Sequence, residues 1–186
     1  MFVKKFPEID LGDHILREQQ ESDVPEFFNY YTDPEVSKYI LADIPKTLEE
    51  TKYELNYWRN IFYRSEGIYF AIAQKSDDKM IGSIGLTTYS KYHNRIELSY
   101  DLSRQYWNQG IMTKSIQALT KYTFETLKIN RLEAITSIFN EASVRLLEKC
   151  GFVYEGCLRQ HRYHLGKFVD VYSFSLLRDD FLKNSV

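Results

Sequence analysis

The sequence predicts one domain of the mixed α/β class, in which helices pack on a mostly antiparallel sheet. A chain of 186 residues holds a single domain with a substantial core and leaves little room for two, so 1–186 is one predicted domain. Three apolar segments at 68–74, 80–89 and 96–102 are joined by short polar turns, which predicts an antiparallel meander. A helical pattern at 110–127 then leads to another strand. Such a crossover joins parallel neighbours and is right-handed.

Composition and charge exclude several functions. The net charge of −2 provides no electrostatic footprint for nucleic acid. No run of about 18 apolar residues is present, which excludes a membrane-spanning helix. The first residues lack the apolar region of a signal peptide. The chain has two cysteines, Cys150 and Cys157, and one disulfide bond would not stabilise a fold of this size. We therefore expect reduced thiols in a cytoplasmic protein.

The first third of the chain is predicted to contain a strand and two helices. Residues 14–20 fit an edge strand, and Ser22 or Asp23 can cap the short helix that follows. Thr47–Glu50 fits a capping box, in which the hydroxyl serves a free N–H group and the glutamate reaches back. The long helix that starts there should end near Arg64. Its apolar face contains Leu55, Trp58, Ile61 and Phe62.

The three strands of the meander differ in their patterns. Residues 68–74 are almost continuously apolar, and residues 80–89 form the returning strand. The strand at 96–102 alternates strictly, which predicts one face toward the core and one polar face. The first face contains Ile96, Leu98, Tyr100 and Leu102, and the polar face contains Glu97, Ser99 and Asp101.

The second half of the chain continues with a helix, a strand, a second helix and two closing strands. Apolar residues at helical spacing predict the helix at 110–127, and residues 131–139 fit a strand. Asn140 can cap the next helix, and Gly151 can end it in a left-handed conformation. We expect the two closing strands to form a hairpin through residues 164–167.

A single glycine marks the start of the helix after the meander, in the stretch DLSRQYWNQGIMTKS (101–115). A helix that begins at Gly110 exposes free N–H groups and a positive dipole end, which suits a phosphate group. Gln105 and Ile111 break the Walker pattern, and no G-x-G-x-x-G run is present. Lys114 in the first turn opposes the helix dipole unless an anion neutralises it. Spacing alone leaves a second interpretation open, in which Gly110 only eases the strand-to-helix turn.

Two motifs together resemble a known family. The segments YWNQGIMTKSIQAL (106–119) and NEASVRLLEKCGFVYEG (140–156) resemble those of the GCN5-related N-acetyltransferase (GNAT) family, and most closely its RimJ/RimL-like branch of ribosomal-protein N-terminal acetyltransferases. The predicted order of elements matches this family over nearly the whole chain. The matching positions are Tyr106, Trp107, Gly110, Thr113, Asn140, Ser143, Lys149, Gly151 and Phe152.

The resemblance implies a fold and a cosubstrate. In the GNAT fold, helices cover both faces of a twisted, mostly antiparallel sheet, and the fourth and fifth strands splay apart in a V. The cosubstrate is acetyl-CoA, with no metal. Its pantetheine arm would lie between the strands ending at Leu102 and Phe139, pair with the main chain from Tyr100 to Leu102, and be reached by Asn140. Its pyrophosphate would rest on the N–H groups of Gln109, Gly110, Ile111, Met112, Thr113 and Lys114.

The chain departs from the family's first motif at three positions. Asn108 stands where a glycine is usual, Met112 where a small residue is usual, and Lys114 where a glutamate is usual. Asparagine tolerates left-handed backbone angles better than most residues, so we expect the turn to survive. The main-chain donors of the phosphate site do not depend on side-chain identity.

The resemblance also implies direct transfer of the acetyl group to an amine, without a covalent enzyme intermediate. The amine must lose a proton, and Glu97 is the candidate base because it lies on the polar face of the central strand. A solvated carboxylate is its alternative role, and Glu155 ranks second as a base. A main-chain N–H near Leu102 would stabilise the developing oxyanion. Ser143 is the candidate acid for the departing thiolate, and its alternative is an ordinary residue of the first helical turn.

We therefore expect an acetyl-CoA-dependent N-acetyltransferase that acts on a protein N-terminal α-amine or a small amine. The alternative is a non-catalytic acyl-CoA-binding or regulatory domain of the same fold, and a monomer and a homodimer stay open. His161 and His164 have i, i+3 spacing, but no partner completes a metal set. Four aromatic residues are candidates to wall the acceptor site, although core packing also fits their spacing: Tyr30, Tyr31, Trp58 and Tyr63.

Overall fold

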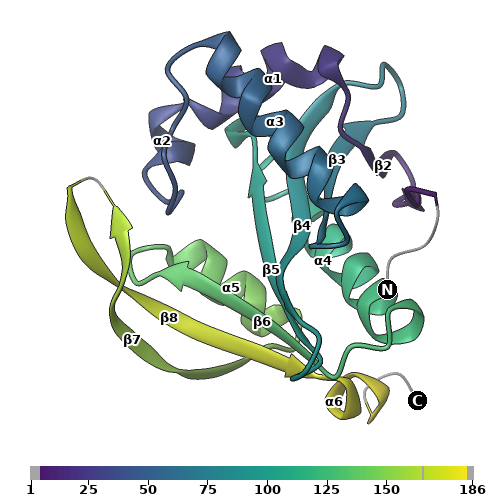
Figure 1. Cartoon of the computed structure of the whole chain (residues 1–186), viewed down its shortest axis with the longest axis vertical. Helices are drawn as coiled ribbons and strands as arrows, with labels where there is room; N and C mark the ends of the chain where they lie inside the picture. The colour runs from purple at the N-terminus through teal and green to yellow at the C-terminus, as the bar shows by residue number, and fades with distance from the viewer. Residues whose placement is uncertain (1–4, 165, 184–186) are drawn as a thin grey trace.

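A single mixed sheet organises the protein, as the computed structural model shows (Figure 1). The structure describes residues 5–164 and 166–183. Over these residues the sheet has eight strands in the order β1-β2-β3-β4-β5-β6-β8-β7, and only β5 and β6 pair in parallel. This confirms the predicted mixed α/β class and the parallel crossover. The strands are β1 (Ile9–Asp10), β2 (His14–Glu18), β3 (Ile68–Gln74), β4 (Met80–Ser90), β5 (Arg95–Leu102), β6 (Arg131–Ser137), β7 (Val153–His164) and β8 (Lys167–Leu177).

The strand predictions hold with two corrections. The expected edge strand is not the edge, because the two-residue strand β1 pairs with β2 on its outer side, Ile9 opposite Leu16. The strand expected to end at Phe139 ends at Ser137, where its pairing with β8 also ends. The closing strands β7 and β8 pair as an antiparallel hairpin, as expected, although residue 165 of its turn lies outside the described residues.

The helices also follow the predicted order. They are α1 (Val24–Tyr31), α2 (Pro34–Ser37), α3 (Leu48–Tyr63), α4 (Ile111–Lys121), α5 (Glu141–Lys149) and α6 (Arg178–Lys183). A π-helical segment at Tyr122–Thr126 continues α4, so the helical stretch ends close to the predicted position. The short helix α2 and the C-terminal helix α6 were not predicted. Within the described part of the chain, no helix is long and apolar enough to cross a membrane.

Local side chains explain where the helices begin. Thr47 accepts a hydrogen bond from the N–H of Glu50 at 3.1 Å, as the capping box requires. The glutamate reaches back as predicted but to another residue. In a capping box its carboxylate accepts from the N–H of the N-cap residue, here Thr47, whereas the Glu50 carboxylate accepts from the N–H of Lys46 at 2.6 Å. At α5, the Asn140 side chain accepts from the N–H of Ser143 at 3.1 Å, which confirms the predicted cap. Gly151 follows this helix at φ +87°, as predicted.

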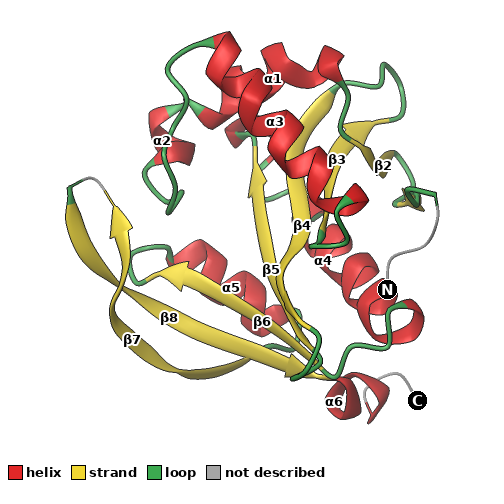
Figure 2. Cartoon of the chain, in the orientation of Figure 1, coloured by secondary structure: helices red, strands yellow, loops and turns green. Residues whose placement is uncertain are grey.

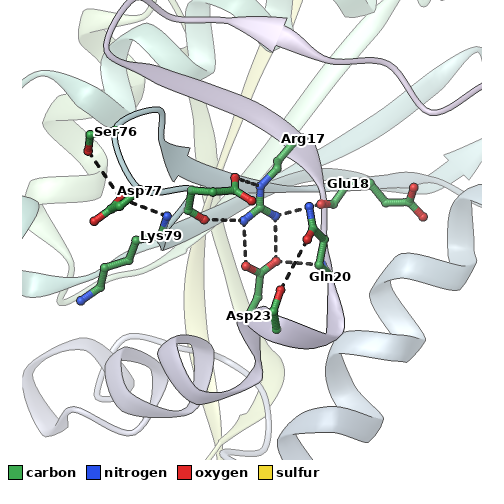
Figure 3. A network of polar contacts seen from close by, with 9 residues as sticks. Arg17, Glu18, Gln20, Asp23, Ser76, Asp77 and Lys79 are labelled. Carbon is green, nitrogen blue, oxygen red and sulfur yellow. Dashed lines mark hydrogen bonds and ion pairs between the residues drawn. The ribbon is translucent and has the colours of Figure 1, made fainter.

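A buried arginine ties the N-terminal strands to α1 (Figure 3). Arg17 lies on β2 and is 6% exposed. Its guanidinium binds both oxygens of Asp23 at 2.8 Å, and its Nε donates to Asp78 at 2.6 Å. Two carbonyl groups, those of Glu18 and Asp78, accept its remaining N–H groups. All five guanidinium donors are therefore used. Asp23 stands at the N-cap position of α1, but its carboxylate serves Arg17 instead of the helix.

The splay between β5 and β6 is the feature that positions the site. These strands pair only from Arg95–Arg131 to Leu98–Ala134. Beyond Leu98, β5 continues to pair with β4, and beyond Ala134, β6 continues to pair with β8. Figure 2 shows the two strands meeting at one end and separating toward α1. Among the residues that the structure describes, the facing edges of β5 and β6 therefore have no strand partner there. Because the unpredicted strand β1 shifts the numbering by one, β5 and β6 are the fourth and fifth strands of the predicted fold, and the V between them is confirmed.

Candidate active site

The turn from β5 into α4 is held by left-handed backbone conformations. Asn108 has φ +60° and Gly110 has φ +76°. A Cβ at position 110 would meet no atom within 4 Å, so glycine is needed there for its backbone angles and not for space. The left-handed Asn108 confirms that asparagine replaces the usual glycine without loss of the turn. The Trp107 indole anchors the turn by donating to the carbonyl of Leu102 at 2.8 Å.

Five of the six N–H groups expected to hold the pyrophosphate have no hydrogen-bond partner within the described part of the chain. They belong to residues 109–113, which precede and open α4. The next N–H, that of Lys114, donates to the carbonyl of Gly110 at 3.1 Å and so forms the first helical bond. The donors that remain available therefore run from Gln109 to Thr113, one fewer than expected. Together with the positive end of the helix dipole they form a candidate anion-binding site.

The side chains of α4 do not block this anion-binding site. Met112 is buried in the main core cluster, in which Ile111 also lies, so its bulk points away from the free N–H groups. Lys114 is exposed on the first turn. The departure from the family motif at Met112 therefore changes core packing and not the surface of the anion site.

Two hydroxyl groups meet across the splay. Tyr100 lies on β5 and Ser143 in the first turn of α5, and their oxygens are 2.7 Å apart. Ser143 is buried, and burial raises the pKa of Tyr100 well above its ordinary value. Sequence reasoning selected both residues, but Tyr100 only for its main chain. The contact between the side chains was missed, because it joins elements 43 residues apart.

Glu97 is a half-buried carboxylate on the polar face of β5. Its side chain is 17% exposed, and burial raises its pKa above the ordinary value. The Arg162 guanidinium lies 3.4 Å away and opposes that rise, as does His161 at longer range. A bulge in β7 turns these side chains toward β5, with Gln160 at φ +51°. A carboxylate with a raised pKa beside an open strand edge is suited to accept a proton.

Glu155, the second candidate base, has a different environment. The guanidinium of Arg131 binds both of its oxygens, one at 2.8 Å, and the Ser175 hydroxyl donates to it at 2.8 Å. Arg131 holds the pKa of this carboxyl below its ordinary value. The residue is thus engaged in linking β7 to β6 and β8.

Asp101 was missed as a functional candidate. It lies on β5 on the same face as Glu97, and it accepts from the Tyr30 hydroxyl and the Ser83 hydroxyl, each at 2.8 Å, and from the Ser83 N–H at 3.1 Å. Burial raises the pKa of Asp101 to about 6. The alternation of β5 already placed it on the polar face. Its burial under α1 depends on a contact 71 residues away.

Other features lie outside this arrangement. A pocket of about 450 Å³ lies between α1 and residues 103–106, beside the turn into α4, and contains neither Glu97 nor Ser143. Tyr63, a candidate wall of the acceptor site, instead is exposed and donates to Glu18 on the N-terminal side. Over residues 5–164 and 166–183, no group of three or more His, Cys, Asp or Glu residues could hold a metal ion.

Comparison with known proteins gives one family. The acetyltransferase (GNAT) domain matches residues 14–153. The uncharacterized N-acetyltransferase p20 of Bacillus licheniformis is 31% identical over 166 residues, 89% of this chain and 93% of that protein. The spermidine N(1)-acetyltransferase of Vibrio cholerae is 24% identical over 61% of this chain and 66% of its own length. The structure of RimL, a ribosomal L7/L12 alpha-N-protein acetyltransferase in complex with coenzyme A, superposes with a TM-score of 0.82 at 22% identity, over 94% of this chain and 99% of that one.

Proposed function

Because this chain belongs to the GNAT family of acetyltransferases, we propose that it transfers the acetyl group of acetyl-CoA directly to a primary amine. The acceptor is a small amine or a protein N-terminal α-amine. The observation that carries the proposal is that an unpaired strand edge and an anion-binding site lie together at one end of β5. The N–H groups of residues 109–113 and the free edge of β5 beyond Leu98 lie on the same chain segment.

The cosubstrate fits these main-chain groups. The pyrophosphate takes the free N–H groups of Gln109 to Thr113, which need no particular side chain. The pantetheine arm carries amide groups, and these pair with the main chain of residues 100–102 in place of a neighbouring strand. The Asn140 oxygen already caps α5, which leaves its amide N–H₂ group for this arm. Acetyl-CoA supplies the acetyl group as a thioester.

Glu97 acts as the general base. Its raised pKa means that it binds a proton more readily near neutral pH than an ordinary glutamate does. The Arg162 guanidinium at 3.4 Å favours the ionised form of Glu97, which is the form that accepts the proton of the amine. The two-point pairing of Glu155 with Arg131 supports this choice over Glu155, because a carboxylate whose pKa is lowered is a weaker base.

Ser143 and Tyr100 serve the departing thiolate. Their hydroxyl groups are within hydrogen-bond distance, so one of them can donate to the thiolate while the other donates to its neighbour. The N-terminus of α5 adds a positive dipole end beside Ser143. A non-catalytic role gains no support from the departures at Asn108 and Met112, because the first adopts the required left-handed angle and the second packs into the core.

The reaction is tested by incubating the protein and acetyl-CoA with a panel of amines and N-terminal peptides. We expect release of free CoA thiol together with a mass increase of one acetyl group on an acceptor. The absence of both with every acceptor class, in a protein that still binds CoA, would favour the non-catalytic alternative.

The cofactor site is tested by Gly110→Glu. We expect loss of CoA binding, because a carboxylate would stand among the phosphate donors and a non-glycine residue would strain the turn. The matched control is Gly12→Glu, which puts the same residue at another exposed left-handed glycine, φ +88°. Unchanged CoA affinity in a folded Gly110→Glu variant, measured by calorimetry, would refute this position for the pyrophosphate.

A further inference from the structure

Four charged residues lie together where β5 and β6 meet, at the closed end of the V (Figure 2). Arg95 and Glu97 are two positions apart on β5, and Arg131 and Glu133 are two positions apart on β6; we call them the charged quartet. In the parallel register Arg95 is opposite Arg131, and Glu97 is opposite Glu133. Opposite residues, and residues two apart on a strand, point to the same face of a sheet. The quartet therefore lies on the face of the candidate base.

Both arginines of the charged quartet pair with the same glutamate. The Arg95 guanidinium reaches across from β5 to one oxygen of Glu133, and the Nε of Arg131 donates to the other oxygen at 2.8 Å. Glu97 is on the same strand as Arg95, yet among the described residues its ion pair is with Arg162 of β7, at 3.4 Å. The two glutamates of the quartet thus have the same neighbours, and only one of them receives the arginines.

This pairing leaves two carboxylates directly opposite one another on adjacent strands, which destabilises a sheet. Burial is the main cause of the raised pKa of Glu97; Arg162 opposes the rise, Glu133 adds to it, and His161 and Arg95 oppose it more weakly. The residue opposite Glu97 on β4 is an uncharged threonine. Charged or titratable groups of three strands share this face with Glu97: Arg95 and Asp101 on β5, Glu133 on β6, and His161 and Arg162 on β7.

The two arginines of the quartet differ in what else holds them. Arg131 also binds both oxygens of Glu155, one at 2.8 Å. Arg95 pairs with Glu133 and, among the residues that the structure describes, with no other carboxylate. If Glu133 lost its charge, Arg131 would stay on Glu155 and Arg95 would be released. Glu97 is then the neighbouring carboxylate for Arg95, on the same strand and the same face.

We propose that Glu133 is a positioning residue for Glu97, because it holds Arg95 away from the base and so keeps the base out of a close ion pair. A carboxylate that accepts a charge-assisted hydrogen bond from a guanidinium is a weaker base, since protonation breaks that bond. The contact between like charges is tolerated here because it keeps Glu97 able to take up a proton. The inference rests on the proposed role of Glu97 in acetyl transfer.

Removal of the Glu133 charge tests this role. In Glu133→Gln we expect kcat/KM at its plateau pH to fall by about 10- to 100-fold, the effect of one hydrogen bond between charged groups. The pH limb assigned to Glu97 should move to lower pH, because the released Arg95 favours the ionised carboxylate. The affinity for CoA should barely change. A plateau and a limb that both match those of the unmodified protein would overturn the proposal.

A second substitution separates positioning from structural support. Arg95→Gln, added to Glu133→Gln, removes the guanidinium that would bind Glu97, and we expect kcat/KM to return to within about threefold of the unmodified protein. Damage to packing would instead accumulate, so a double variant as slow as Glu133→Gln would overturn the proposal. The matched control is Glu155→Gln, which leaves both arginines on Glu133 and should keep the plateau and the limb. A limb that moves as far in this control would also overturn it.

A titration that needs no turnover distinguishes this inference from the proposed function. Carbon-13 NMR of the Glu97 carboxyl group, assigned by its absence in Glu97→Gln, measures proton binding directly. We expect this titration to move to lower pH in Glu133→Gln and to return in the double variant. These shifts in a protein that acetylates no acceptor would refute the proposed function and still support the control of Glu97 by Glu133. A titration that does not move would overturn the inference whatever the activity.

Arg95→Gln alone provides the test if Glu133→Gln does not fold. The Arg95 side chain is 39% exposed, so we expect its removal to be tolerated. Glu133 then keeps only Arg131 of the quartet, and more of its negative charge acts on Glu97. The Glu97 titration should therefore move to higher pH, the direction opposite to that in Glu133→Gln. A titration that stays in place or moves to lower pH would overturn the proposal.

Discussion

Two regions of this molecule place charged side chains in the interior, and they do so in opposite ways. On β2, the five donors of Arg17 are all used, by two carboxylates and two carbonyl groups (Figure 3). On β5, the half-buried Asp101 has hydroxyl and N–H partners, and no described residue forms an ion pair with it. Among the same residues, Glu97 pairs with one guanidinium, that of Arg162, at 3.4 Å. The first arrangement is complete within the protein. The second leaves charge that a substrate can meet.

The difference follows from the position of each strand in the sheet. β2 is paired along its length on one side with β3, and its polar groups connect it to α1 and to the β3–β4 turn. β5 loses one of its neighbours after Leu98. A strand whose edge is open must leave main-chain and side-chain groups unsatisfied, and these are the groups that a bound molecule can use. Completeness of polar pairing therefore distinguishes the structural region from the candidate site.

The largest expected effect tests the unpaired side of this comparison. Glu97→Gln should lower turnover by about 10²- to 10⁴-fold, the usual range for general acid–base catalysis. The affinity for acetyl-CoA should barely change. In the unmodified protein kcat/KM should rise with pH through the raised pKa of Glu97, and this limb should be absent in the variant.

Glu155→Gln is the control for the base. It removes a carboxylate that is already paired with Arg131, so stability should fall while turnover per folded molecule stays close to that of the unmodified protein. The opposite result, with full activity in Glu97→Gln and loss in Glu155→Gln, would reverse the assignment.

The paired side of the comparison is tested by Arg17→Met. This change leaves Asp23 buried without its cation, and we expect a loss of about 3–5 kcal/mol in the free energy of unfolding, measured with urea. Arg64→Met removes the exposed pair with Glu66 and should cost less than about 1 kcal/mol. Comparable losses in the two variants would mean that the buried network has no special structural role.

A smaller effect concerns the pH dependence of stability at Asp101. Its folded pKa of about 6 lies above the ordinary 3.8, so the folded protein binds this proton more tightly than the unfolded chain does. The resulting stabilisation is present below about pH 4 and is lost as pH rises to about 6. As pH rises from about 4 to about 6, the free energy of unfolding of the unmodified protein should therefore fall by about 3 kcal/mol from this group. Asp101→Asn has no proton to lose there, so its free energy of unfolding should not show this fall. Parallel stability curves for the two proteins would contradict the raised pKa.

The smallest expected effect is that of Ser143→Ala. Removal of one hydrogen bond to the departing thiolate should slow the chemical step by up to about tenfold. The dissociation constant of CoA should stay nearly unchanged, because the interaction strengthens only as charge develops on sulfur. Both kcat and the melting temperature should be measured on one preparation. Lower stability with full kcat would remove Ser143 from the mechanism and leave it as part of the α5 cap.

The sequence by itself determined the elements and the local geometry of the cofactor turn. Alternation along 96–102 predicted β5, and the residue types at Asn108, Gly151 and Asn140 predicted two left-handed positions and a helix cap that the structure contains. These features depend on interactions within a few residues along the chain. They could be predicted because the backbone angles and the nearest hydrogen bonds follow from the side chains present.

Only the tertiary structure decided which side chains meet. The contact between Tyr100 and Ser143 joins residues 43 apart, and that between Tyr30 and Asp101 joins residues 71 apart. Likewise, Glu97 and Glu155 are both glutamates on predicted strands, and only the fold pairs one of them with Arg131 and half-buries the other. The pKa of a carboxyl group depends on burial and on neighbouring charge, and both arise when distant segments pack together. No local pattern in the sequence carries that information.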